Sequence, residues 1–319
     1  MSEIASAIET ITAIQVAMIR ASDAPHRGQH AKMNGCLNAT FEIRPDIPQA
    51  LKVGLFSAVQ NFDAVIRFSN GSQTDDRKPD IHGMAMKLLN VPGKKVLDAE
   101  ARATEQDFVL ADNPTFFIRD ANDYVLFMQD FVSSAPLGKP PERFISHLKE
   151  HHPEDIPVLL QFRQQVQHDP LTSTYWSQVP YAFGSRQGTV CRYRSSPLEG
   201  TVGSATAGLL PDYLRERMIE RLAPGRDEVR FDFAVQVKTH ADESVIDNPT
   251  VEWTEPFISL ATIHIPSQIF DTVTQNQFGD NLSFSPWHAL LEHRPIGEIN
   301  EIRKAVYLAS QALRQAPPP

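Results

Sequence analysis

The chain has 319 residues, of which 41% are hydrophobic and 22% are charged, and its formal net charge is -9. A general nucleic-acid binder normally carries a basic balance or stripe, so this charge argues against one. The sequence has no run of about 18 apolar residues that would predict a membrane span, and its start lacks the basic and apolar blocks of a signal peptide. Two cysteines, Cys36 and Cys191, are too few for a disulfide framework. These features predict a globular protein of the cytoplasm.

The hydrophobic spacing predicts a helix at 3–20, followed by strands with alternating apolar residues. The clearest strand is VRFDFAVQV, in which every second residue from Val229 to Val237 is apolar. A mostly helical region punctuated by prolines separates two blocks of strands, and two more helices are expected at 286–293 and 296–314. The predicted strands cover 36–43, 63–69, 82–89, 107–111, 189–194, 229–237 and 258–265.

This order lacks the regular alternation of strand and helix that is typical of a parallel α/β sheet. We therefore predict an α+β fold in which both strand blocks form one antiparallel β-barrel with helices packed outside it. The C-terminal tail QAPPP is expected to be disordered. A single domain would comprise an N-terminal helical arm (1–24), a first barrel half (25–135), a mostly helical connection (136–186), a second barrel half (187–270) and C-terminal helices (271–319).

The predicted C-terminal helix carries cations on the side that should face the core. At about 100° of rotation per residue, Arg303, Tyr307 and Arg314 lie within an arc of roughly 40°. An unpaired guanidinium is costly to bury, so we expect a buried anionic group against this face. The same stripe contains Ile299, Val306 and Ser310.

Two other segments carry polar residues that the fold alone does not explain. The segment HRGQHAK places Arg27, His30 and Lys32 just before a predicted strand, although a single histidine beside basic residues is more often a surface or structural residue. In IRFSNGS, Arg67 lies on an apolar strand and shares a face with Ser69. A solvent-facing Arg67 would explain this pattern equally well.

Taken together, these segments resemble the catalase family. RGQHAK is similar to the segment with the family's distal histidine, and RFSNGSQTDDRKPDIHGMAMKL to its Arg-Phe-Ser stretch followed by a Gly-x-Ala-x-Lys strand. NPTFFIRD is similar to the family's Phe-Phe-Ile-Arg-Asp segment. RKAVYLASQALR matches the proximal pattern of an arginine, a tyrosine four residues later and a further arginine seven after that. The matches cover 27–127 and about 283–314 and follow the family's order.

The resemblance implies a catalase-type barrel with haem b between the barrel and the C-terminal helix. Tyr307 would be the axial ligand of the haem iron, as in catalases. Arg303 would stabilise its phenolate by a charge-assisted hydrogen bond, because a phenol with a pKa near 10 otherwise keeps its proton at neutral pH. Arg27, Arg67 and Arg314 would neutralise the haem propionates.

On the other side of the haem, the resemblance implies that His30 is the general acid–base. It would move a proton between the two oxygens of the peroxide and so promote a ferryl intermediate. Ser69 would fix the tautomer of the imidazole through a hydrogen bond. The candidates for the pocket walls are Phe116, Phe117, Tyr124 and Phe127.

The sequence also departs from the family pattern. Catalases have a distal asparagine ahead of the Phe-Phe pair, whereas LADNPTFF puts Ala111 there without a gap, and Asp112 or Asn113 with one; we favour Asn113 because its amide is uncharged. Gln29 precedes His30, where efficient catalases tend to have an apolar residue. The sequence is also shorter than full-length catalases, so we expect a haem edge that is more open to organic molecules.

These departures favour a haem peroxidase that reduces H2O2 or organic hydroperoxides with electrons from a small organic donor and keeps some catalase activity. One alternative is a fatty-acid hydroperoxide isomerase resembling allene oxide synthases, and another is a haem-binding protein without catalysis. By likeness to the family, a homodimer or homotetramer formed through the N-terminal arm is expected. His147 and His151 have a spacing that metal ligands can use, but their charged neighbours favour a solvated helix face.

Overall fold

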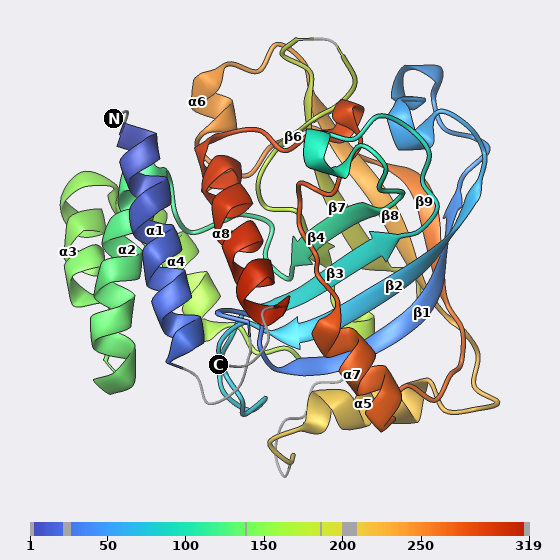
Figure 1. Ribbon diagram of the computed structural model, residues 1–319, viewed down its shortest axis with the longest axis horizontal. Helices are drawn as coiled ribbons and strands as arrows, with labels where there is room; N and C mark the ends of the chain where they lie inside the picture. The colour runs from blue at the N-terminus through green and yellow to red at the C-terminus, as the bar shows by residue number, and fades with distance from the viewer. Residues whose placement is uncertain (1–2, 22–26, 138, 186, 200–208, 316–319) are drawn as a thin grey trace.

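The computed structural model describes residues 3–21, 27–137, 139–185, 187–199 and 209–315. In this part of the chain the strands form one antiparallel sheet (Figure 1). None of the helices described there is long and apolar enough to cross a membrane. The strands are β1 (Met33–Ile43), β2 (Asn61–Asn70), β3 (His82–Leu88), β4 (Gln106–Ala111), β5 (Tyr175–Trp176), β6 (Tyr181–Ala182), β7 (Val190–Pro197), β8 (Val229–Lys238) and β9 (Phe257–Ile265).

The sheet closes into a barrel. Its order is β5-β4-β3-β2-β1-β9-β8-β7-β6, and β5 also pairs with β7. Trp176 of β5 makes the closure, because it pairs with Ala111 on one side and Arg194 on the other. Eight strands therefore form a closed ring, and β6 is attached to β7 at its edge. Closure leaves few free strand edges, which is how barrels avoid unwanted pairing with other chains.

The helices lie outside the barrel. Figure 1 shows α1, α2, α3 and α4 gathered on one side, with α8 between this group and the strands. Helix α8 packs against α1, and α1 also packs against α2. The helices are α1 (Glu3–Arg20), α2 (Ala121–Ser134), α3 (Glu142–His151), α4 (Ile156–Gln164), α5 (Tyr213–Arg221), α6 (Glu243–Ile246), α7 (Val273–Asn281) and α8 (Glu298–Gln315).

Aromatic side chains fill the interior of the barrel. The ring of Phe233 lies 5.1 Å from that of Phe41 and 4.7 Å from that of Phe108, and Phe108 lies 5.0 Å from Tyr193. These four side chains are buried, and each contributes about 1.5–3 kcal/mol by leaving water. The packed interior means that a large ligand has to bind outside the barrel.

The structure confirms the predicted α+β class, the antiparallel barrel and all seven predicted strands. The two short strands β5 and β6 were not predicted. The helix expected at 286–293 is wrong, since only a 3-10 turn at Leu291–His293 forms there. Side chains at the start of β4 hold this segment extended: Asp107 accepts from the Ser285 N–H and Gln106 from the Leu290 N–H. The predicted disordered tail lies outside the described residues, apart from Gln315.

Candidate functional site

Two rows of side chains cross β2, β3 and β4 on the outside of the barrel. Ser69 pairs with Gly83, and Gly83 pairs with Ala111. Side chains alternate along a strand, so Phe68, between Arg67 and Ser69, packs into the core while this row points outward. The second row, two residues along each strand, is Arg67, Ala85 and Val109. The residues of both rows line one cavity, and we call them the barrel wall.

His30 lies against the barrel wall. Its backbone is left-handed, with φ 55°, and its N–H donates to the carbonyl oxygen of Gly71 at 2.7 Å. The imidazole Nδ1 lies 3.1 Å from the Ser69 hydroxyl oxygen. A Cβ atom at Gly83 would lie 2.8 Å from the same nitrogen, so the ring packs directly on the glycine backbone. This arrangement leaves Nε2 as the nitrogen that can meet a ligand in the cavity.

The surroundings of His30 favour its neutral form. Burial is the largest cause, followed by the positive charge of Arg67, and together with His82, Arg27 and Arg303 they lower the pKa of the imidazole from 6.5 to about 3. His30 is therefore uncharged at neutral pH and can accept a proton.

Helix α8 forms the opposite side of the cavity. The Arg303 guanidinium donates to Asn300 Oδ1 at 3.1 Å and lies 3.5 Å from the Tyr307 hydroxyl oxygen. Burial opposes the charge on Arg303, but the phenolic oxygens of Tyr307 and Tyr181 outweigh it, and the pKa of the guanidinium is raised. We call this side the helix wall; its residues in the cavity are Ile299, Arg303, Val306, Tyr307, Ser310, Gln311 and Arg314.

Three arginines gather at one part of the cavity without a carboxylate partner. Among the described residues, Arg27 and Arg314 both donate to the backbone carbonyl of Leu282, and each donates to one further backbone carbonyl. Arg314 also donates to the Ser283 hydroxyl. Arg67 donates to the carbonyl of Ala31.

Asp280 favours the charged form of all three arginines but makes no ion pair with them among the described residues, so their charges are only partly balanced. Burial lowers the pKa of Arg27 to about 8 and that of Arg67 to about 10, and it lowers that of Arg314 as well. The Nε atoms of Arg67 and Arg314 are buried and have no hydrogen-bond partner among the described residues. This part of the cavity thus fits a ligand that carries carboxylates or another anionic group.

The stretch expected to supply a distal amide has a clear arrangement. Ala111 lines the cavity in the row of Ser69 and Gly83. Asp112 points elsewhere and binds His82, whose N–H and Nδ1 lie 2.7 and 3.0 Å from its carboxylate oxygens. Asn113 is buried outside the cavity lining, and its Oδ1 accepts from the Thr115 N–H. The structure therefore does not bring Asn113 to the site, because Ala111 is the outward-facing residue that ends β4.

Of the aromatic walls expected from the sequence, Phe116 and Tyr124 line the cavity. Phe117, the residue after Phe116, points the other way and packs on Phe127 at 4.9 Å and on Phe162 at 4.8 Å. Phe117 and Phe127 therefore belong to the core between α2, α3 and α4. Two polar residues that the sequence did not indicate, Gln15 of α1 and Gln178 in the loop before β6, also line the cavity.

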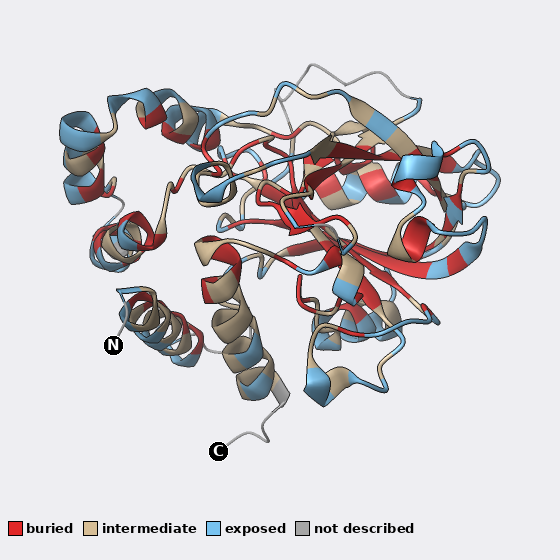
Figure 2. Ribbon diagram, turned by 90° about the horizontal axis from the view of Figure 1, so that it is seen from above, coloured by how far each residue is buried: buried red, intermediate tan, exposed pale blue. Residues whose placement is uncertain are grey.

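The two walls enclose about 1280 Å³ of empty space, the open mouth included. Figure 2 shows α8 running beside the barrel. The barrel strands are mostly buried, and α8 is mostly of intermediate exposure (Figure 2). In this cavity the structure brings together Arg27, His30, Arg67, Ser69, Phe116, Arg303, Tyr307 and Arg314.

Comparisons with known proteins agree with this arrangement. Residues 7–143 match the family model for catalase. No curated protein matches the sequence. Among solved structures, a fungal catalase matches with a TM-score of 0.71 and 19% sequence identity. The match covers 95% of this chain and 61% of the fungal chain.

Two further solved structures give similar values. Catalase A from Saccharomyces cerevisiae has a TM-score of 0.71 and 17% identity, over 94% of this chain and 63% of its own. A bacterial catalase has a TM-score of 0.69 and 16% identity, over 94% and 59%. The chain thus spans about three fifths of the length of the catalases it matches. Residues 7–143 are thus similar to the catalase family, and the described chain has the fold of the catalases.

Proposed function

We propose that this chain is a haem-dependent peroxidase that reduces H2O2 or organic hydroperoxides with electrons from a small organic donor and retains some catalase activity. The observation that carries the proposal is that His30 and Tyr307 line one cavity, His30 against the barrel wall and Tyr307 on the helix wall. A base and a phenolic metal ligand in one cavity are suited to an iron centre between them.

The residues present fit a haem b group. Tyr307 would bind the iron, and the adjacent Arg303 would hold the phenolate oxygen in its charged form. Arg27, Arg67 and Arg314 would pair with the two haem carboxylates, which explains three cations without a carboxylate partner in the described protein. When bound, haem supplies a redox-active iron that exchanges electrons with peroxide.

On the peroxide side, His30 would do the proton transfer. Its neutral Nε2 accepts a proton from one peroxide oxygen and returns it to the other, which leaves as water or an alcohol. Ser69 holds Nδ1 and keeps the ring from turning. The low pKa of His30 supports this role, because the imidazole is available as a base at neutral pH.

The distal side supports a peroxidase more than a dedicated catalase. Ala111 lines the cavity where the family resemblance implies an amide, so it offers no side-chain donor to a second peroxide molecule. Gln29 is exposed and lines the cavity beside His30. A polar, exposed side chain there suits the approach of an organic electron donor.

Stopped-flow absorbance of the haem-loaded protein tests the proposal. The protein is mixed with H2O2 or with a fatty-acid hydroperoxide, each with and without a phenolic donor. We expect a rapid change in the haem spectrum with peroxide, and a return to the starting spectrum that the donor accelerates. Consumption of the lipid hydroperoxide alone, without a donor, would replace this function with that of an isomerase, and no reaction with either peroxide would leave only haem binding.

A further inference from the structure

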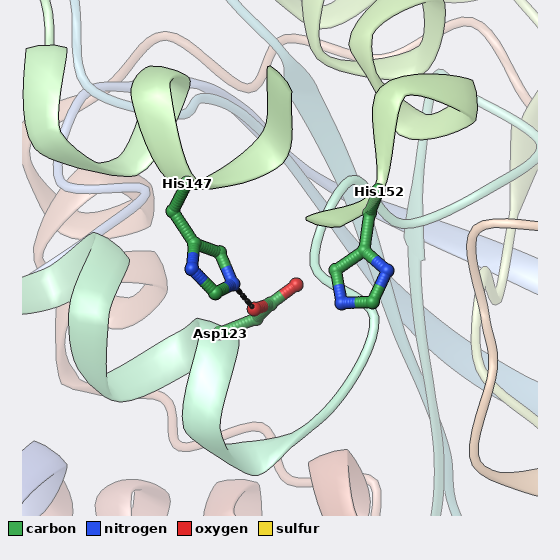
Figure 3. A group of neighbouring side chains, drawn as sticks. All are labelled: Asp123, His147 and His152. Atoms are coloured by element: carbon green, nitrogen blue, oxygen red, sulfur yellow. Dashed lines mark hydrogen bonds and ion pairs between the residues drawn. The ribbon is translucent and has the colours of Figure 1, made fainter. Parts of the chain in front are cut away.

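A second group of polar side chains lies away from the cavity, between α2 and α3. Figure 3 shows Asp123 from the first turn of α2 between His147 of α3 and His152, the residue that follows α3. Each residue offers one ligand atom, and these atoms lie within 4.8 Å of one another. None of the three lines the cavity, although Tyr124, the neighbour of Asp123, does. The cluster is therefore separate from the proposed haem site.

The carboxylate of Asp123 is only partly satisfied. One oxygen, Oδ1, lies 2.9 Å from His147 Nε2. The other, Oδ2, is buried and has no hydrogen-bond partner among the described residues, and only 2% of Asp123 is exposed. Figure 3 shows this oxygen on the side of the His152 ring. A buried carboxylate oxygen without a hydrogen-bond partner carries a desolvation cost. A cation between Asp123 and His152 would offset this cost.

The three ligand types decide which cation fits. Two imidazoles and a carboxylate are ligands for zinc and its transition-metal neighbours, whereas calcium and magnesium prefer oxygen ligands alone. Ligand atoms about 2.1 Å from a tetrahedral zinc ion lie about 3.4 Å apart. The widest separation in the cluster, up to 4.8 Å, would have to contract by up to about 1.4 Å. His147 and His152 are of intermediate exposure, so packed side chains do not enclose either ring on all sides.

We infer that Asp123, His147 and His152 form a binding site for a divalent transition-metal ion, with zinc as the best fit, and that water completes the coordination. The ion would join the start of α2 to the end of α3. This role differs from the pairing of His147 and His151 that their spacing in the sequence suggests. Helix α3 ends at His151, and the backbone of His152, with φ -140° and ψ 56°, leaves the helical conformation and places its imidazole beside Asp123 (Figure 3).

Calorimetric titration of the metal-free full-length chain with ZnCl2, after removal of any affinity tag, tests the inference. We expect one zinc ion per chain and a rise in Tm with zinc, because the ion binds the folded state. His152→Ala should weaken binding by roughly 100-fold or more, since one of three ligands is lost. This variant keeps the hydrogen bond between His147 and Asp123, so its effect would not come from breaking that pair.

The matched control is His151→Ala. His151 is exposed, its ring lies 4.7 Å from that of His147, and it is outside the cluster. It should bind zinc as the unchanged protein does. No stoichiometric zinc binding by the unchanged protein, or equal affinity in His152→Ala, would overturn the site, and a loss caused by His151→Ala would move it to the surface of α3. Replacement of zinc by Co2+ should give the visible absorption of a four-coordinate ion.

Discussion

The two sides of the cavity are built on different principles. On the barrel wall, the register of three strands fixes the positions of Ser69, Gly83 and Ala111. On the helix wall, one helix repeat sets the positions of Arg303 and Tyr307. Strand register leaves little room, as the 2.8 Å distance at Gly83 shows. On the helix wall, every residue after Ile299 is of intermediate exposure, so we expect changes of size to be tolerated better there. The barrel wall should therefore be sensitive to shape, and the helix wall to charge and ligand chemistry.

The start of α8 is nevertheless well anchored. Asn300 donates to the carbonyl of Pro180, next to β6, and accepts from the indole of Trp287 through its own carbonyl. Its side-chain oxygen accepts from Arg303. The first turn is thus fixed to the barrel, and this turn sets the direction in which Tyr307 points.

The largest effect should come from removing the phenol on the helix wall. Tyr307→Phe removes the proposed iron ligand with almost no change of shape, so the haem spectrum should lose the features of tyrosinate ligation. Absorbance and resonance Raman spectra of the haem-loaded variant measure this. Tyr124→Phe is the control, because it removes another phenol that lines the cavity. An unchanged spectrum in Tyr307→Phe would contradict the assignment.

His30→Ala should have the next largest effect. Haem binding should remain, while the rate constant for the reaction with H2O2 falls by about 10²- to 10⁴-fold, as for the loss of a general acid–base. Stopped-flow measurements at several H2O2 concentrations give this constant. Gln29→Ala serves as the comparison in the same loop, and a wild-type rate in His30→Ala would remove the imidazole from the mechanism.

Gly83→Ala tests the sensitivity of the barrel wall to shape. The added methyl group would lie 2.8 Å from His30 Nδ1 and should displace the imidazole. We expect the peroxide rate constant to fall by roughly 10- to 100-fold, because displacements of about 1 Å have such effects. Ala85→Gly changes the size of the neighbouring position in the second row and should leave the rate nearly unchanged. Equal rates in both variants would mean that the wall is less rigid than its register implies.

Ala111→Asn should sharpen the same comparison with a smaller effect. It introduces an amide into the row that contains Ser69 and Gly83, on the side of the cavity where His30 lies. We expect oxygen release from H2O2 to increase a few-fold relative to oxidation of a phenolic donor. An oxygen electrode and a donor assay on the same preparation give the ratio, and a decrease in it would argue against the distal amide as the missing group.

The smallest effect should be that of pH on the peroxide reaction. For an ordinary histidine with a pKa near 6.5, the fraction in the basic form at pH 5 would be roughly 30-fold lower than at high pH. The pKa of His30 is lowered to about 3, so its rate constant should stay nearly flat from pH 8 to 5. The same shift makes the free energy of unfolding fall as the pH drops from 6.5 toward 3, because only the unfolded chain then takes up the proton. A rate that halves near pH 6.5 would contradict the low pKa.

Much of this architecture could be predicted from local patterns. Alternation identified the seven longer strands, and it placed Arg67 and Ser69 on the face opposite to Phe68. Helical periodicity placed the stripe of Arg303 and Tyr307 on one side of the last helix. Both patterns are properties of short segments, and burial of one face is enough to select them.

The errors arose where contacts between distant segments decide the outcome. The two residues of β5 are a strand only because β4 and β7 flank them. The segment 286–293 has helical spacing, but side chains from the start of β4 bind its backbone. Asp123 meets His147 and His152 because α2 packs on α3. None of these partners is near in the sequence, so no local pattern could indicate them.

The closure of the barrel also affects how the protein is made on the ribosome. Strand β1 pairs with β9, and Thr40 lies opposite His264, which is synthesised roughly 220 residues later. One edge of β1 therefore stays unpaired until β9 has been made. Until then the nascent chain exposes the unpaired edge of β1 and the apolar inner face of β1 to β4. We expect the emerging chain to depend on chaperones during this interval, and refolding in vitro to be slow and to give lower yields as the protein concentration rises.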